Sequence, residues 1–392
     1  MNNNSIRQAV MTKPGKIEMK QVAAPEIKKN EVLLRIKHIG ICGSDIHVNH
    51  GLHPFTSYPV IQGHEFSGII EEVGSEINNL YPGMNVTGRP QIVCGDCGPC
   101  DRGDYNICDE LKVEGFQAPG VAQDLFSTSP DKIITLPSSL SLEHGALIEP
   151  VSVAVHATKK AGDLQGKHIT VFGAGPIGNL IGQVCQSLGA AKVLIRDVSD
   201  FRLSIAKSCG LENISNATDE SMSDAKSRIF GNDSYSIAFE AVGIESTMKD
   251  GIATIEKGGK LIIVGVFGEK PKIDMALVGD RELNLIGSLM YKHQDFEEAV
   301  RLIELGKIIL SPLITKHFPL EQYEDLLESY ATVTSESLYE HRYDAEVYVI
   351  GMISEVRVVT TKKSGDRMAI VTLEDLEGSI PMVIFPETYE AS

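Results

Sequence analysis

The chain has 392 residues, of which 42% are hydrophobic, and a formal net charge of −17. At about 100–200 residues per domain, this length indicates two or three domains with sizeable cores. A uniformly acidic chain is a poor non-specific partner for nucleic acid or for an anionic membrane surface. No apolar run approaches the roughly 20 residues that a membrane-spanning helix needs, so we expect none.

The cysteines predict metal binding in a reducing compartment. They occupy positions 42, 94, 97, 100, 108, 185 and 209. The count is odd and four of them lie close together, which is typical of metal-binding thiolates rather than of disulfides. The first residues also lack the apolar core of a signal peptide. We therefore expect a cytoplasmic protein.

Residues 6–40 predict short strands over 7–11, 17–22 and 31–38, because apolar and polar residues partly alternate between turn residues. We expect this mostly β segment to deliver residues 41–47 on a loop. A helix there is disfavoured because Gly51 and Pro54 follow closely.

Two dense clusters of reactive side chains follow these strands. The first contains Cys42, Ser44, Asp45 and His47, and the second contains His64 and Glu65. A buried apolar thiol is the ordinary interpretation of a lone cysteine, but no core strand would accept so many polar neighbours. We interpret Cys42 and His64, together with the distant Glu149, as ligands of one zinc ion.

The spacing Cys94-x2-Cys97-x2-Cys100-x7-Cys108, interspersed with glycine and proline, predicts a second metal site. Zinc takes four thiolates tetrahedrally in structural sites. A disulfide pair conflicts with a reducing compartment. In the bacterial iron–sulfur pattern the fourth cysteine comes sooner and proline follows it. Four thiolates leave no open position, so we expect this zinc to be structural.

Glu149 lies within an apolar run over 142–157 that predicts a helix. A carboxylate in so apolar a stretch is costly unless it is paired or bound to metal. A surface glutamate at a helix boundary is the alternative, and the residues leave both interpretations open.

Residues 168–288 predict a parallel, doubly wound sheet. The strand 168–172 precedes Gly173, Gly175, Pro176, Ile177 and Gly178, which open a helix reaching about residue 188. This is the dinucleotide fingerprint, whose glycines admit the pyrophosphate at a helix N-terminus. Further strands are expected over 192–196, 236–240, 260–264 and 282–287, and an amphipathic helix over 295–306.

The cofactor preference depends on charges after the second strand of this sheet. Asp197 follows Gly178 by nineteen positions, where an acidic residue accepts from the ribose 2′-hydroxyl and repels a 2′-phosphate. NAD is therefore expected, although the neighbouring Arg196 and Arg202 weaken the argument against NADP. We place Arg202 at the cofactor, together with Val264 and Val266.

Residues 6–325 resemble the zinc-dependent medium-chain dehydrogenase/reductase family, and most closely its sorbitol or L-iditol dehydrogenase branch. The resemblance rests on ICGSDIH, YPVIQGHEFSG, CGDCGPCDRGDYNIC, EPVSVAVHA and GAGPIG. It implies a groES-like catalytic domain, a Rossmann domain, two zinc ions and NAD. It also implies a homodimer or homotetramer that oxidises a secondary alcohol of a polyol.

The resemblance assigns roles to individual residues. Cys42, His64 and Glu149 would bind the catalytic zinc, with Glu65 as an alternate ligand or as the residue that positions a zinc water. Ser44 would relay the alcohol proton, His47 would pass it toward the ribose, and Asp45 would brace His64. The alternative substrates within the family are threonine and sugar-alcohol phosphates.

The C-terminal part departs from that family. Strands are expected over 346–353, 368–373 and 379–385, and this part resembles the OB-fold segment of the bacterial DNA polymerase III alpha subunit. From residue 331 it has 5 Lys or Arg against 11 Asp or Glu, so strong nucleic-acid binding is not expected. A nucleic-acid-binding fusion protein is nevertheless the alternative function from another class.

We accordingly expect a groES-like domain over 1–155 and 289–330, a Rossmann domain over 156–288, and a partial OB-like β segment over 331–392, with the junction between the two resemblances somewhere in 316–332. An OB-fold is a five-stranded barrel, and this segment supplies about three strands. We therefore interpret it as an appended or chimeric module.

Overall fold

The structure is a computed structural model that describes residues 5–328, 352–360, 366–374 and 379–386. The chain divides into two compact units, residues 1–321 and 322–392. Among helices in the described part of the chain, none combines the length and the apolar character needed to cross a bilayer.

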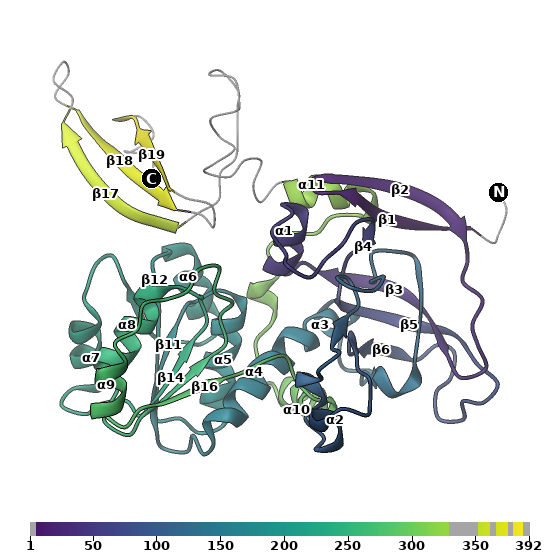
Figure 1. Cartoon of the computed structure of the whole chain (residues 1–392), viewed down its shortest axis with the longest axis horizontal. Coiled ribbons are helices and arrows are strands. Elements are labelled where there is room, and N and C mark those ends of the chain that lie inside the picture. Colours follow the sequence, from purple (N-terminus) through teal and green to yellow (C-terminus); the bar gives the residue numbers. More distant parts are fainter. Residues whose placement is uncertain (1–4, 329–351, 361–365, 375–378, 387–392) are drawn as a thin grey trace. The chain divides into compact units, whose positions relative to one another are not determined.

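The first part of unit 1 is mostly antiparallel β structure (Figure 1). Its strands form a three-stranded sheet of order β2-β1-β4, a five-stranded sheet of order β10-β6-β5-β3-β9 and the pair β7-β8. Alternate residues such as Leu34, Phe66 and Val86 fill the core of the five-stranded sheet, as expected for half-buried strands. The bounds are β1 (Ser5–Lys13), β2 (Lys16–Ala23), β3 (Val32–Gly40), β4 (Val60–Ile61), β5 (Glu65–Val73), β6 (Asn85–Gly88), β7 (Gln91–Ile92), β8 (Lys112–Val113), β9 (Leu125–Thr128) and β10 (Ile133–Thr135).

Short helices interrupt these strands. They are α1 (Gly43–Asn49), α2 (Gly98–Asp101), η1 (Tyr105–Ile107), η2 (Pro130–Lys132) and α3 (Leu142–Ala146). The expectation of a loop over residues 41–47 is wrong, because α1 begins at Gly43. Its start is capped by Asp45, whose Oδ2 accepts a hydrogen bond from the Cys42 backbone N at 2.9 Å. Gly51, with φ +76°, ends the helix instead of preventing it.

The second part of unit 1 is a six-stranded parallel sheet of order β13-β12-β11-β14-β15-β16. This arrangement confirms the predicted fold class, a groES-like part joined to a doubly wound parallel sheet. One face packs against α4, α5, α6 and α10, and the other against α7, α8 and α9, each with its own apolar cluster. The strands are β11 (His168–Phe172), β12 (Lys192–Asp197), β13 (Asn213–Asn216), β14 (Ile237–Glu240), β15 (Lys260–Ile263) and β16 (Asn284–Gly287).

The helices of this part are α4 (Ile148–Ala161), α5 (Pro176–Ser187), α6 (Asp200–Ser208), α7 (Met222–Phe230), α8 (Glu245–Thr254), α9 (Met275–Asp280) and α10 (His293–Glu304), followed by η3 (Ser311–Leu313). Helix α10 begins two residues before the predicted start. The reason is again an aspartate in the first turn, because Asp295 accepts a hydrogen bond from the Lys292 backbone N at 2.7 Å.

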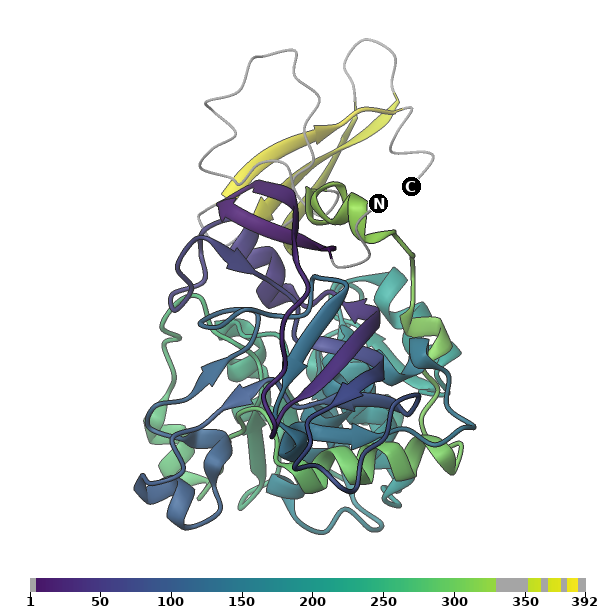
Figure 2. The ribbon, with the colours of Figure 1, turned by 90° about the vertical axis from the view of Figure 1, so that its right-hand side faces the viewer.

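Unit 2 contains a three-stranded antiparallel sheet of order β17-β18-β19, drawn in yellow in Figure 2. Its strands are β17 (Met352–Thr360), β18 (Arg367–Glu374) and β19 (Ser379–Ile384); helix α11 (Tyr323–Glu328) precedes them, and η4 (Leu320–Gln322) spans the junction of the units. The first strand was expected over residues 346–353, and residues 346–351 lie outside the described part of the chain. The OB-fold resemblance stays a prediction.

Candidate metal and cofactor site

Helix α1 and strand β5 bring three predicted metal ligands together. One ligand atom each from Cys42, His64 and Glu65 lies within 4.8 Å of the others. We call these three residues the Cys42 group. Both His64, which immediately precedes β5, and Glu65, which begins it, are buried. Glu65 lies opposite the end of β3, where it pairs with Gly40. A Cβ on Gly40 would collide with the Glu65 side chain, so this glycine makes room for the carboxylate.

Asp45 faces the imidazole of this group. It is fully buried, and its Oδ1 lies 3.7 Å from His64 Nδ1. On the other side of the ring, His64 Nε2 lies 4.0 Å from Glu65 Oε1. The Nδ1 edge of His64 therefore faces a second carboxylate, and the Nε2 edge faces the candidate ligands, as in metal sites whose histidines are braced from behind.

Glu149 lies beside the Cys42 group and outside the set of atoms within 4.8 Å. It is buried in the first turn of α4, which disfavours the interpretation as a surface glutamate. Its Oε1 accepts a hydrogen bond from the hydroxyl of Tyr291. Sequence reasoning missed Tyr291, which is 142 positions away and has no local pattern that would mark it.

The ionisation of these residues fits a divalent cation. Burial raises the pKa of the Cys42 thiol, and burial together with the charge of Glu149 raises the pKa of Glu65 to about 8. Burial also raises the pKa of Glu149. These groups are costly to ionise in an apolar interior unless a cation compensates them. A thiolate, an imidazole and a carboxylate are donors that zinc accepts.

Ser44 and His47 lie on α1 next to this group. Ser44 Oγ is 3.8 Å from Cys42 Sγ. His47 is half-buried in the last turn of the helix, where burial, together with the neighbouring His50, lowers its pKa. A neutral imidazole is able to accept a proton, which is the chemistry that a relay needs.

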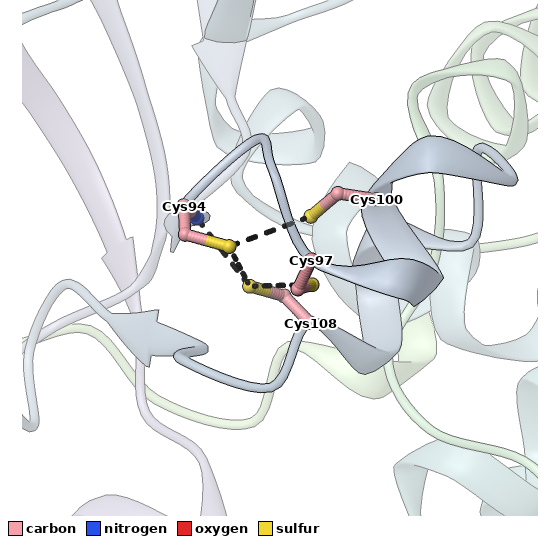
Figure 3. A group of neighbouring side chains, drawn as sticks. All are labelled: Cys94, Cys97, Cys100 and Cys108. Atoms are coloured by element: carbon pink, nitrogen blue, oxygen red, sulfur yellow. Dashed lines mark hydrogen bonds between the residues drawn. The ribbon is translucent and has the colours of Figure 1, made fainter.

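A second group consists of Cys94, Cys97, Cys100 and Cys108 (Figure 3). We call the segment 94–108, which carries these four cysteines, the thiolate lobe. The Sγ atoms are 3.4 Å apart for Cys94 and Cys108, 3.8 Å for Cys97 and Cys108, and 4.0 Å for Cys94 and Cys100. A tetrahedron with zinc–sulfur bonds of about 2.3 Å has edges of about 3.8 Å. Hydrogen bonds from the Asp109 and Cys100 amides lower the pKa of Cys97 to about 7. The pKa values of Cys94 and Cys100 are raised instead, so it is the spacing of the four sulfur atoms that fits one zinc ion.

The glycine loop between β11 and α5 has room for a pyrophosphate. Gly173 has φ +98°, and a Cβ on Gly178 would collide with the Gly173 carbonyl. A Cβ on Gly175, in contrast, would meet nothing within 4 Å. The first and third glycines thus serve the turn, and the second faces open space at the N-terminus of α5, which is where a dinucleotide phosphate binds.

Asp197 lies at the end of β12 and is tied to this loop. Its Oδ2 accepts from the Ala174 backbone N at 2.7 Å and lies 3.8 Å from the exposed Arg202 guanidinium. Arg196 points elsewhere, since it is buried and donates to Ser215 Oγ and the Glu220 carbonyl. Of these two arginines, Arg202 is therefore the one that lies beside Asp197. Val264 and Val266 follow the end of β15, at the same edge of the sheet, and Val266 is 79% exposed.

Comparison with known proteins agrees with this architecture. The alcohol dehydrogenase GroES-like domain family matches residues 28–138, and the zinc-binding dehydrogenase family matches residues 176–304. L-threonine 3-dehydrogenase of Rhizobium etli is 32% identical over 83% of this chain and 96% of its own length. Sorbitol dehydrogenase 2 of Saccharomyces cerevisiae is 33% identical over 84% of this chain and 95% of its own length.

Solved structures give the same result. Galactitol-1-phosphate dehydrogenase from Escherichia coli superposes with a TM-score of 0.78 at 29% identity, covering 82% of this chain and 96% of that one. The 2R,3R-butanediol dehydrogenase from Bacillus subtilis gives 0.76 at 26% identity, covering 83% and 95%. The chain belongs to the zinc-dependent medium-chain dehydrogenase family. It is an oxidoreductase that uses zinc and a nicotinamide dinucleotide.

Proposed function

We propose that the protein is an NAD-dependent polyol dehydrogenase that interconverts a secondary alcohol of a sorbitol- or L-iditol-type substrate and the ketone. The observation that carries the proposal is the Cys42 group, where a thiol, an imidazole and a carboxylate lie within 4.8 Å of one another. Similarity to the sorbitol dehydrogenases supports the substrate class.

In this proposal Cys42, His64 and Glu65 hold the catalytic zinc, and Asp45 keeps His64 Nε2 turned toward it. Zinc at this position supplies a Lewis acid that lowers the pKa of an alcohol hydroxyl. Ser44, which follows Cys42 by two residues, relays the hydroxyl proton, because it accepts this proton as it gives up its own. His47, one helical turn further along α1, passes the proton toward the cofactor ribose.

The remaining residues bind the cofactor and hold the architecture. Gly173, Gly175 and Gly178 place the pyrophosphate at the N-terminus of α5, and Asp197 accepts from the ribose hydroxyls and so favours NAD. The thiolate lobe holds a second zinc ion. We further propose that the enzyme is a homo-oligomer and that the C-terminal strands are an appendage with no part in the chemistry.

A substrate panel tests the proposal. With two zinc ions per chain, the enzyme should form NADH from sorbitol, L-iditol, xylitol or galactitol. Absence of turnover on every polyol, with NAD and with NADP, in a fully zinc-loaded sample would refute the polyol assignment.

The same panel tests the main alternative within the family. L-threonine belongs in it because the threonine dehydrogenase of Rhizobium etli is as similar to this chain as the sorbitol dehydrogenases are. Galactitol 1-phosphate belongs in it because of the structural match to its dehydrogenase. A value of kcat/KM for either compound above that of every polyol would replace the proposed substrate and leave the proposed metal site intact.

A further inference from the structure

Tyr291 is buried in contact with the residue whose role as a ligand is ambiguous. The residue is fully buried, and its hydroxyl donates a hydrogen bond to Glu149 Oε1. Its ring packs edge-on against Phe296, with centroids 4.9 Å apart. The hydroxyl thus fixes the direction of the Glu149 carboxylate, which lies next to the Cys42 group but is not part of it.

The backbone that carries Tyr291 is in an unfavourable conformation. Met290 has φ +50°, in the left-handed region that side chains with a Cβ rarely adopt. Such a conformation persists where surrounding contacts over-determine it, and it is concentrated at functional sites.

Contacts on both sides of Met290 supply that constraint. Gln91 Nε2 donates to the Tyr291 carbonyl at 2.8 Å, and Asn106 Nδ2 donates to the Leu289 carbonyl at 3.0 Å. Both donating side chains are buried. Gln91 lies just before the thiolate lobe, and Asn106 lies within it, between Cys100 and Cys108.

The two residues before Asn106 in the thiolate lobe also form hydrogen bonds with the segment 289–293. Asp104 Oδ1 accepts from Lys292 Nζ at 2.6 Å, and the Tyr105 hydroxyl accepts from the His293 backbone N. Three consecutive lobe residues therefore contact positions 289, 292 and 293, which bracket Tyr291. All three lie in the loop between Cys100 and Cys108, two of the four cysteines that could hold the second zinc ion.

We propose that Tyr291 is a positioning residue that holds Glu149 beside the Cys42 group, and that the thiolate lobe keeps Tyr291 in place. The lobe then acts on the ligand set of the catalytic zinc in addition to stabilising the fold. Loosening the lobe or removing the hydroxyl allows Glu149 to compete with Glu65 as a ligand. This inference rests on the proposed ligand group.

Cobalt replacement tests it without relying on turnover. Visible absorption of Co²⁺ reports the number and type of its ligands. Cobalt bound in the thiolate lobe adds the same absorption to the spectrum of every variant that keeps the four lobe cysteines. The Cys42→Ser variant of the full chain first identifies the bands that belong to the Cys42 group. Tyr291→Phe, which keeps the ring packed on Phe296, should then shift those bands and change the rate of metal loss to a chelator by about tenfold.

Combining Tyr291→Phe with a second substitution distinguishes a positioning role of Tyr291 from a merely structural one. In the Glu149→Gln background the Tyr291→Phe change should alter neither the bands nor the rate of metal loss by more than about twofold, because the residue acts through that carboxylate. Asn106→Leu should shift the bands in the same direction as Tyr291→Phe, and the two changes together should add little. The matched control is Tyr81→Phe, which removes the hydroxyl of an exposed tyrosine and should leave the bands unchanged.

The possible failures are distinct. Bands that do not depend on Cys42 would overturn the proposed ligand group and this inference with it. Bands that depend on Cys42 but are unchanged in Tyr291→Phe would overturn the inference alone. An equal shift by Tyr291→Phe with and without Glu149 would show that the tyrosine acts on the fold and not through the carboxylate, which also contradicts the inference.

Discussion

Asp45 Oδ1 lies 3.7 Å from His64 Nδ1, while Asp45 Oδ2 accepts a hydrogen bond from the Cys42 backbone at 2.9 Å. One buried carboxylate therefore contacts one member of the candidate ligand group and faces another. It caps the helix that begins after Cys42, and we propose that it braces the imidazole of His64 from the side opposite Glu65.

This relationship predicts the effect of Asp45→Asn. The amide oxygen still accepts from the Cys42 amide, so the helix cap is kept, but the negative charge facing His64 is lost. Partners of this kind typically contribute about 10–100-fold to metal affinity. We expect a loss of that size for the catalytic zinc, measured by competition with a chromophoric chelator. Unchanged affinity would show that Asp45 is only a helix cap.

Asp197→Ala predicts a change in cofactor preference. A carboxylate about 4 Å from a phosphate disfavours it by roughly 1 kcal/mol or more, which is about fivefold or more in affinity. The ratio of kcat/KM for NAD to that for NADP should fall by at least this factor. Arg202→Ala should raise the ratio, and Arg196→Lys should leave it unchanged. An unaltered ratio in Asp197→Ala would mean that Arg202 alone determines the preference.

The left-handed backbone at Met290 predicts that glycine is more stabilising than isoleucine at this position, which is the reverse of the order in an ordinary strand. Met290→Gly should melt at a higher temperature than Met290→Ile, because a β-branched residue at φ +50° costs about 1–2 kcal/mol. The matched control is Met19 in strand β2, which is 40% exposed, where isoleucine should instead be more stable than glycine. The same order at both positions would contradict the assigned conformation of Met290.

Asp295 predicts a dependence of stability on pH. Burial alone would raise its pKa, but hydrogen bonds from His156, Lys159 and the Lys292 amide hold the pKa below its ordinary value of 3.8. A depressed carboxyl pKa gives stability that is fully present above pH 3.8 and is lost as the pH falls through the folded-state pKa.

The comparison of wild type with Asp295→Asn measures this contribution. The difference in free energy of unfolding should be constant above about pH 5. Below the unfolded-state pKa it should shrink by up to about 1.4 kcal/mol per pH unit. Urea unfolding of both proteins across this range provides the measurement, and a difference that does not vary with pH would contradict the pairing.

The sequence predicts well those features that depend on local spacing. The cysteines at 94–108 and the glycines at 173–178 lie within short segments, so their arrangement follows from residue type and separation. Five strands of the parallel sheet follow from apolar runs between turns, whereas β13 (Asn213–Asn216) was not predicted because Ile214 is its one apolar residue. The capping roles of Asp45 and Asp295 were not predicted. Each is the third residue of a helix, where its carboxylate caps the helix start. Interpreting Asp45 only as a reactive side chain concealed the start of α1.

Features that depend on long-range packing could not be predicted. From the sequence, Glu149 is the expected ligand and Glu65 the alternate, whereas the structure groups Glu65 with Cys42 and His64. Glu149 is instead bonded to Tyr291, which comes from a distant segment. The different partners of Arg196 and Arg202 likewise depend on packing between distant segments, since Arg196 donates to Ser215 and Glu220 while Arg202 lies beside Asp197. Contacts among residues 91, 106 and 289–293 have no local pattern.

Metal content measured together with turnover tests the central claim most directly. Wild-type enzyme should contain two zinc ions per chain and form NADH from a polyol of the panel, whereas Cys42→Ser should contain one and form none. Cys209→Ala, whose thiol lies outside both cysteine-containing groups, should retain both ions and turnover. Undiminished turnover or two retained zinc ions in Cys42→Ser would contradict the assignment of Cys42 to the catalytic zinc.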